Sequence, residues 1–322
     1  MNNKLQDINY LSSKKTVIFG FSLLLIAITA ISFGPIFVKL SITEIGAKAT
    51  VFNRFWIATV IFGLWNFIDT ISQKSSAHTS SDDNHVYTYK VIGLLLLMGS
   101  LFAGIHLLWA WSLSQTSVAN SITILHGLRP LLTVLGGWLF FKKFFDLKFL
   151  TGMIIAIAGA ILIGFNDFSD SMIKLEGDLL SVISAVLSAL ELLIMEHLLT
   201  KFTTKILMFW CCLVATLVTV IILIVTDNHF FPISLKGWLA VIALALCSQV
   251  IGQGLITYSL NYLSSGLVAI IMLIDPVLST ILAWSILSEQ LSIANSIFCS
   301  IVLFGIYLSL SSQYALKKEL VS

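Results

Sequence analysis

Charged residues are scarce in this sequence. Only 11% of its 322 residues are Asp, Glu, Lys or Arg, whereas a soluble domain has about 25%, and 58% are apolar. The charges sum to +2, and the lysines are scattered through the connections, so the concentrated basic surface of a nucleic-acid-binding protein is missing. This scarcity excludes a sizeable soluble domain and predicts a chain whose main solvent is lipid, with no nucleic-acid partner.

Metal-ligand spacings and catalytic motifs are also missing. The four cysteines, Cys211, Cys212, Cys247 and Cys299, lie inside apolar runs, without metal-ligand spacing or a disulfide framework. The sequence has no His-Glu-x-x-His, no Gly-x-Ser-x-Gly and no P-loop. These absences argue against an enzyme and against an ATP-driven pump, and we expect no cofactor and no metal.

Apolar runs near twenty residues fill most of the chain. A bilayer core about 30 Å thick needs about 20 apolar residues per helix, so the runs predict an all-α integral membrane protein with ten transmembrane helices. The first run is too long for a cleaved signal peptide and is counted as a helix. The predicted helices are Thr16–Val38, Ala49–Ile68, Val91–Leu113, Ser117–Phe141, Leu147–Phe165, Leu179–Leu199, Ile206–Val225, Trp238–Leu260, Gly266–Leu287 and Ile293–Ser311.

The second half of the chain repeats the first at an offset of 146 residues. This offset superposes Pro130 on Pro276 and Trp138 on Trp284 without a gap. Each copy has five spans, an odd number, so the second copy enters the membrane from the opposite side and the repeat is inverted, as in many secondary transporters. The alternative is an old duplication retained only for packing.

The repeat sets the expected domain organisation. We predict a tail at 1–15, a first five-helix unit at 16–165, an external linker at 166–176, a second five-helix unit at 177–311 and a tail at 312–322. Positively charged connections stay preferentially in the cytoplasm, and twelve Lys lie on the side of the N-terminus against four on the other side. We therefore expect both termini in the cytoplasm, in the plasma (inner) membrane of a bacterium.

Three charged residues fall near the middles of predicted spans: Arg129, Glu191 and Asp275. A charge at mid-membrane costs roughly 2.5 to 3.5 kcal/mol on insertion scales, so each needs a partner or a purpose. Arg129 and Asp275 directly precede the matching prolines, Pro130 and Pro276, which we expect to bend their helices and to free polar backbone beside the charges.

These residues suggest two alternatives. In one, Arg129 holds a substrate carboxylate or pairs with Asp275, while Asp275 or Glu191 takes up a proton during the cycle. In the other, Arg129 and Asp275 form a permanent ion pair that only stabilises the bundle.

Polar residues also recur at helical spacing. One stripe in the fourth span contains Thr123, His126, Arg129 and Thr133, a second contains Ser184, Ser188 and Glu191, and a third contains Gln249, Gln253 and Thr257. Such stripes either line a wet cavity or bond across helix interfaces. His106 and His126 are candidate proton relays or satisfied interior histidines.

Two further features have two interpretations each. Arg54, in the second span, either snorkels to the interface or acts at an outer gate. Small residues recur every fourth position, at Gly152, Ala156, Ala160 and Gly164 and at Gly177, Ser181, Ala185 and Ala189. We interpret them as helix contacts, with the fifth helix a candidate homodimer face.

The sequence resembles the drug/metabolite transporter superfamily, specifically EamA-type ten-helix permeases. The most specific match runs from Asp275-Pro276-Val277-Leu278-Ser279 through Ala283-Trp284 to Ser288-Glu289-Gln290-Leu291-Ser292, with Pro130-Leu131-Leu132-Thr133 to Trp138 in the first half. The resemblance implies a central cavity lined by helices 1 to 4 and 6 to 9, peripheral helices 5 and 10, and export of amino acids or related metabolites. The sequence departs from the pattern at Lys143, which stands opposite Glu289, and at Arg129, where the family's first half often has a small residue.

The leading expectation is therefore a secondary carrier for a small polar solute, such as an amino acid, working by alternating access and driven by the substrate gradient or by exchange with protons. Carriers for nucleotides, sugars or amines remain alternatives, and a membrane-embedded enzyme or a channel is a weaker one. The candidate substrate-binding residues are Arg129, Asp275, Glu191, His126, Gln249, Gln253, Arg54 and His106.

Overall fold

The computed structural model describes residues 18–75, 87–115, 118–141, 145–165, 172–226, 230–287 and 293–312, and the regular elements within these ranges are all helical. A first helix covers residues 18–32. The others are α2 (Gly34–Ser75), α3 (Tyr89–Gln115), α4 (Val118–Phe141), α5 (Leu147–Phe165), α6 (Met172–Leu198), α7 (Thr204–Thr226), α8 (Leu235–Ala243), the π-helix η2 (Leu244–Gln253), α9 (Gly254–Ser259), α10 (Ser265–Ile271), α11 (Ile274–Leu287) and α12 (Ile293–Leu310).

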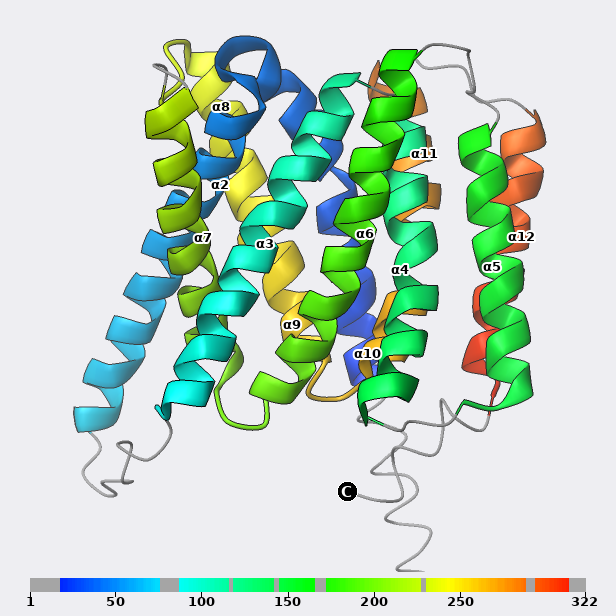
Figure 1. Cartoon of the computed structure of the whole chain (residues 1–322), viewed down its shortest axis with the longest axis horizontal. Helices are drawn as coiled ribbons and strands as arrows, with labels where there is room; N and C mark the ends of the chain where they lie inside the picture. The colour runs from blue at the N-terminus through cyan, green and yellow to red at the C-terminus, as the bar shows by residue number, and fades with distance from the viewer. Residues whose placement is uncertain are drawn as a thin grey trace, which may run out of the picture.

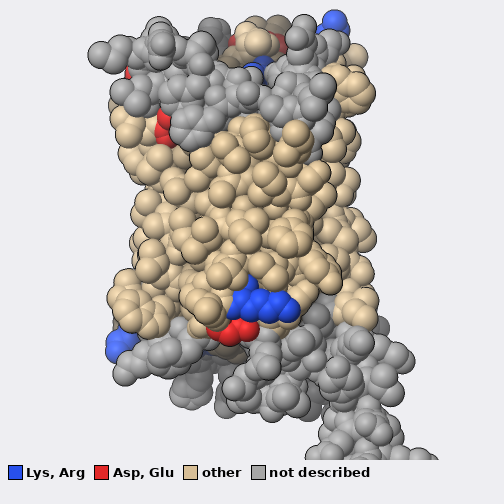
Figure 2. Space-filling model, turned by 90° about the vertical axis from the view of Figure 1, so that its right-hand side faces the viewer, with Lys and Arg blue, Asp and Glu red and all other residues tan. Residues whose placement is uncertain are grey.

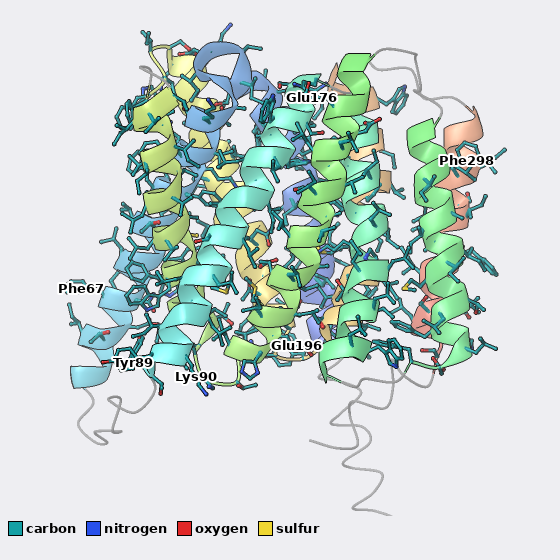
Figure 3. All side chains as sticks on the ribbon, in the orientation of Figure 1. Phe67, Tyr89, Lys90, Glu176, Glu196 and Phe298 are labelled. Carbon is teal, nitrogen blue, oxygen red and sulfur yellow. The ribbon has the colours of Figure 1, made fainter. Side chains whose placement is uncertain are left out.

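The helices form a bundle with the dimensions and surface of a membrane protein. Within the described residues, six apolar stretches are long enough to cross a bilayer, and three shorter ones, Ile124–Leu139, Leu147–Gly159 and Ser300–Leu310, lie within α4, α5 and α12. Glu176 and Glu196 mark opposite ends of α6, which crosses the bundle (Figure 3). Uncharged residues form a broad band across the face shown in Figure 2, with charges near its ends. The chain is an all-α integral membrane protein of ten spans in two inverted five-helix units, as predicted.

The first two predicted spans lie in one apolar stretch, Ile18–Ile71, which turns back at one end of the bundle (Figure 1). The turn is Gly46, whose φ of +74° strains any residue with a side chain. The residues between the predicted spans are helical on both sides of Gly46, and α2 continues to Ser75, so the predicted limits at Val38, Ala49 and Ile68 were wrong. Similarly, α6 begins at Met172, inside the linker predicted at 166–176.

Three spans are irregular near the centre of the bundle. The first helix is interrupted by a turn at Phe33, immediately before Gly34-Pro35. The eighth span contains η2, and π-helical turns are frequent at functional sites. The ninth span, predicted as one helix from Gly266 to Leu287, divides into α10 and α11 at Met272–Leu273. Hydrophobicity alone gives no signal for these breaks, because the side chains on both sides are apolar.

Close approach of backbones explains the small residues of the fifth span. α5 packs extensively against α12, at one side of the bundle (Figure 1). A Cβ on Gly305 would stand 2.3 Å from the backbone nitrogen of Ala156, and one on Gly152 would stand 2.5 Å from that of Ser309. Gly152 and Ala156 therefore contact α12 of the same chain, and they are not available as the dimer face that the sequence suggested.

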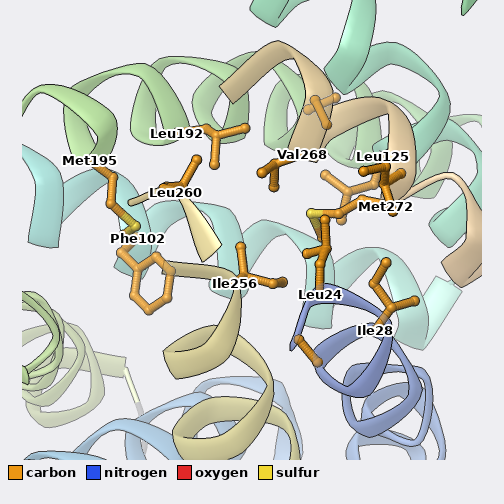
Figure 4. Close-up of a cluster of buried hydrophobic side chains, with 14 of the residues drawn as sticks. Leu24, Ile28, Phe102, Leu125, Leu192, Met195, Ile256, Leu260, Val268 and Met272 are labelled. Carbon is orange, nitrogen blue, oxygen red and sulfur yellow. The ribbon is translucent and has the colours of Figure 1, made fainter. Parts of the chain in front are cut away.

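The interior is filled by apolar side chains from both halves. Phe102 of α3, Leu125 of α4, Leu192 of α6 and Met272 after α10 lie in one buried cluster with the first helix's Leu24 (Figure 4). Within lipid such packing, together with hydrogen bonds between helices, holds the bundle together. Ser112, Ser121 and Ser181 supply bonds of this kind, with oxygens 2.7 to 3.1 Å apart across α3, α4 and α6.

Glu44 ties the two halves together at the end of the bundle that carries the Gly46 turn. Its carboxylate accepts hydrogen bonds from the backbone N–H groups of Ile233 and Ser234, both at 2.7 Å, and from the Ser234 hydroxyl at 2.5 Å. Ser234 also caps α8. A Cβ on Gly237 would lie 2.3 Å from Glu44, so the glycine makes room for this carboxylate.

Candidate functional site

A cavity of about 50 Å³ lies at the centre of the bundle, between elements of both halves. It has room for only a few water molecules. Seven of the eight candidate residues line it, all except Gln249: Arg54, His106, His126, Arg129, Glu191, Gln253 and Asp275. Residues that are far apart in the sequence, from Arg54 to Asp275, therefore surround one cavity. Neither the order of the helices nor their hydrophobicity requires this arrangement.

Arg129 pairs with Glu191 and not with Asp275. Its Nη2 lies 3.4 Å from Glu191 Oε2, and both side chains are almost completely buried. Its Nη1 lies 3.3 Å from the Met272 sulfur. The alternative of a permanent Arg129–Asp275 ion pair is therefore wrong, because α6 brings a closer carboxylate, that of Glu191, to Arg129. A buried charge with one long ion-pair contact and a weak sulfur acceptor is incompletely compensated.

Asp275 belongs to a second cluster. It accepts a hydrogen bond from the hydroxyl of Ser32, at the end of the first helix, and its Oδ2 lies 3.5 Å from His126 Nε2. The Ser279 hydroxyl donates to the same carboxylate at 3.3 Å. The cavity thus has one carboxylate beside a guanidinium and another beside an imidazole and two hydroxyls.

Arg54 is inside the bundle and does not snorkel. Only 2% of its surface is exposed, and its Nε donates a 2.7 Å hydrogen bond to the side-chain oxygen of Gln249. Gln249 in turn lies 3.5 Å from the Cys212 sulfur, so this glutamine holds Arg54 from behind the cavity. Of the two interpretations of Arg54, snorkelling to the interface is wrong, because the side chain faces the interior of the bundle, where Gln249 accepts its N–H.

Of His106 and the residues of the polar stripes, some line the cavity and others bond across helix interfaces. His106 Nδ1 lies 2.9 Å from the Phe102 carbonyl and its ring packs on Phe55, yet it also lines the cavity. Ser188 lines the cavity as well, whereas the Ser184 hydroxyl donates across the interface to the Ile105 carbonyl of α3. The remaining stripe members lie away from the cavity or outside the described side chains: the Thr257 hydroxyl lies 3.0 Å from the Met195 sulfur, Thr133 is buried, and the side chain of Thr123 is not described.

The two matching prolines, Pro130 and Pro276, lie at different positions within their helices. Pro130 lies inside α4, which continues through it, whereas Pro276 lies in the first turn of α11, directly after the break at Met272–Leu273. A proline is tolerated in a first turn because its missing N–H would have no partner there. The halves therefore differ at this point in backbone as well as in charge, and only the second half has a break beside its charged residue.

Several cavity residues gave no clear sequence signal. Trp109 lines the cavity, and its indole N–H has no hydrogen-bond partner although it is buried. The Nε of Arg129, a residue that the sequence did indicate, is also buried without a hydrogen-bond partner. Ser32 and Pro35 flank the Phe33 turn, and the Ser-Phe-Gly-Pro sequence, a helix-breaking cluster within an apolar run, is the signal that could have indicated this part of the site.

An inverted repeat of membrane-spanning helices around a buried polar cavity is the architecture of secondary transporters. The sequence profile of the EamA-like transporter family matches residues 18–165 and 175–311, one match in each half. The chain belongs to this family, within the drug/metabolite transporter superfamily, as the resemblance indicated.

A relative and a solved structure support this assignment to different extents. A protein of Bacillus subtilis (strain 168), described as "Uncharacterized transporter YxxF", is 28% identical over 197 residues; the match covers 58% of this chain and 61% of that protein, less than two thirds of its length. A solved crystal structure is similar with a TM-score of 0.70 at 19% identity, over 94% of this chain and 99% of the other. At that identity the likeness shows the fold alone.

Proposed function

We propose that this protein is a secondary transporter, not an enzyme, that exports a small carboxylate-bearing metabolite such as an amino acid. The observation that carries the proposal is the buried cavity where two N–H donors, Arg129 Nε and the Trp109 indole nitrogen, have no partner. A buried donor without an acceptor costs about 1 to 3 kcal/mol, and a carboxylate supplies the acceptors.

Charge compensation supports the same class of substrate. Arg129 is held by a 3.4 Å contact with Glu191, longer than a good charge-assisted hydrogen bond. A substrate carboxylate that binds Arg129 leaves Glu191 with a weaker partner, which favours protonation of Glu191. Asp275, beside His126 and Ser32, is the alternative proton acceptor. Proton exchange is therefore the proposed coupling.

The size of the cavity supports a cycle of conformations. About 50 Å³ holds water but not an amino acid, so this conformation is closed around the site. Three irregular segments border it: the turn at Phe33, η2, and the break at Met272–Leu273. Such segments absorb backbone changes more easily than regular helix does, and in our proposal they let the two inverted halves open first one face and then the other.

We further propose that both termini face the cytoplasm of a bacterium, as the distribution of twelve and four lysines favours. A C-terminal fluorescent reporter should then be active in cells, and a C-terminal alkaline phosphatase inactive. The reverse pattern would contradict this orientation.

Counterflow in liposomes tests the function. Purified protein is reconstituted with a high internal concentration of each member of a panel of amino acids, amines, nucleotides and sugars, and uptake of the labelled compound is followed with and without an imposed pH gradient. We expect saturable counterflow for at least one amino acid and none with Arg129→Gln. Counterflow only with nucleotides, sugars or amines would contradict the assignment of a carboxylate substrate.

A further inference from the structure

A second and much larger hollow lies between α2, α7 and α9. Its volume is about 650 Å³, and we call it the α2–α9 groove. Most of its wall is apolar, and the residues that line it are Phe62, Trp65, Thr203, Thr204, Lys205, Val250, Ile251, Gly254, Leu255, Tyr258 and Asn261. None of these lines the central cavity.

The groove opens toward the lipid. Trp65 and Ile251 are 45% and 44% exposed, and they adjoin rows of exposed apolar residues on the outer faces of their helices. On α2 the row is Val60, Leu64 and Ile68, and on α8 and η2 it is Leu239, Ile242 and Leu246. In a bilayer these faces meet acyl chains, so the groove's natural occupant is an apolar chain.

One end of the groove has the composition of a membrane interface. Thr203 precedes α7, Thr204 and Lys205 begin it, and Asn261 follows α9, at the end of the bundle where Phe67, Tyr89 and Lys90 lie (Figure 3). Tyr258 is partly exposed on the same stretch of chain as Asn261. Trp, Tyr and Lys are typical of the headgroup level, so the occupant should have a polar head here.

A lysine and an aspartate form an ion pair at the polar end of the groove. Lys205 forms an ion pair with Asp69, and its ammonium lies 4.7 Å from the centre of the Trp65 ring. The two side chains are 36% and 40% exposed, so a headgroup can reach both. A purely anionic headgroup would meet Asp69 unfavourably, whereas a headgroup with a phosphate and an ammonium complements both members of the pair.

We propose that the α2–α9 groove is a binding site for a zwitterionic aminophospholipid. Its acyl chain lies along Phe62, Val250 and Leu255, its phosphate contacts Lys205, and its primary ammonium donates to Asp69. The groove and the central cavity share a wall, because η2 contributes Val250 and Ile251 to one and Ser248 and Gln253 to the other. The bound lipid therefore supports the segment that carries Gln249 and Gln253.

Native mass spectrometry of the full chain, released from micelles with defined lipids, tests the headgroup assignment without any variant. Phosphatidylethanolamine should bind roughly five- to tenfold more tightly than phosphatidylcholine with the same chains, because the choline group has no N–H to donate to Asp69. Equal binding of these two lipids, or tighter binding of phosphatidylglycerol, would overturn the proposal.

Two variants test the contacts of the lipid headgroup and of the lipid acyl chain separately. Asp69→Asn should reduce the preference for phosphatidylethanolamine to about one. Ile251→Trp, which fills the groove, should reduce binding of all three lipids by about tenfold or more, and Ile221→Trp, on the exposed face of α7, should leave it unchanged. Unchanged binding by both Asp69→Asn and Ile251→Trp would contradict this site. The assay contains no solute, so a failure of counterflow would leave its result unaffected.

Discussion

At the scale of single residues, the central feature of this protein is a set of buried charges that are partly compensated. Arg129, Glu191 and Asp275 are each no more than 5% exposed, and Arg129 retains an N–H without a partner. A fully satisfied ion-pair network would serve stability alone, whereas a partly satisfied one favours a ligand that completes it. The following two predictions depend on these residues.

Removal of one member of the Arg129–Glu191 pair should be more harmful than removal of both. Arg129→Gln should lower the free energy of unfolding by about 3 kcal/mol, because it leaves a buried carboxylate without its cation. The double variant Arg129→Gln, Glu191→Gln should recover a large part of this loss. Unfolding in mixed micelles measures both, with the exposed Lys201→Gln as a control that stays near the wild type. Strictly additive losses would show that the two residues do not interact.

Replacement of Asp275 should impair accumulation of solute driven by a pH gradient more than it impairs solute counterflow. A gradient of one pH unit is worth about 1.4 kcal/mol per proton, so one exchanged proton can support about tenfold accumulation of solute. If Asp275 accepts that proton, Asp275→Asn should retain counterflow but lose accumulation driven by pH, while Ser279→Ala, which removes a neighbouring hydroxyl, should keep both. Normal accumulation with Asp275→Asn and with Glu191→Gln would contradict proton exchange at this cavity.

At the scale of elements, helix contacts between the halves hold the bundle in this conformation, and two of them can be tested by single substitutions: the α5–α12 packing and the hydrogen bonds that Glu44 accepts at the start of α8. The first depends on glycine, since backbones approach where Gly152 and Gly305 face each other. The second depends on a charged carboxylate at a helix N-terminus, where N–H groups without helical partners accept an anion. Each contact leads to a prediction.

Gly305→Ala should destabilise the protein by about 1 to 3 kcal/mol, because the new methyl would overlap the backbone of Ala156. Gly93→Ala is a matched control in α3: a Cβ there would have nothing within 4 Å, and the change should be neutral or stabilising by about 0.5 kcal/mol. Thermal unfolding of the two variants measures the difference. Similar melting temperatures would contradict a close α5–α12 contact.

The Glu44 contact should weaken in acid. Hydrogen bonds from the Ser234 hydroxyl and backbone hold the pKa of Glu44 below its ordinary value of 4.5. A lowered carboxyl pKa contributes stability above the ordinary value and loses it as the pH falls through the folded value. Glu44→Gln should therefore melt below the wild type at pH 7, and the difference should close at pH values below 4.5. Glu176→Gln, an exposed acid at the same end, is the control (Figure 3). A gap that stays constant with pH would mean that charge is irrelevant there.

At the scale of the whole molecule, the sequence predicted the architecture but not the pairing inside it. The number of spans, the two halves and the peripheral fifth and tenth helices follow from hydrophobicity, the 146-residue offset and the family resemblance, because a bilayer admits few architectures. The sequence also indicated most residues of the cavity, since charges within apolar runs are costly. It did not predict that Arg129 pairs with Glu191, because helix packing decides which carboxylate is closer. Nor did it predict the break at Met272–Leu273, because local hydrophobicity is the same on both sides.

The central claim is that this cavity is the path of the solute, so it should be reachable from both sides of the membrane. Ser248, which lines the cavity from η2, is replaced by cysteine in a variant whose four native cysteines are changed to serine or alanine, and a membrane-impermeant thiol reagent is added to either side of sealed vesicles. We predict labelling from both sides, with slower labelling from each when a transported solute is present. Labelling from one side only, under every solute and pH gradient, would contradict the claim.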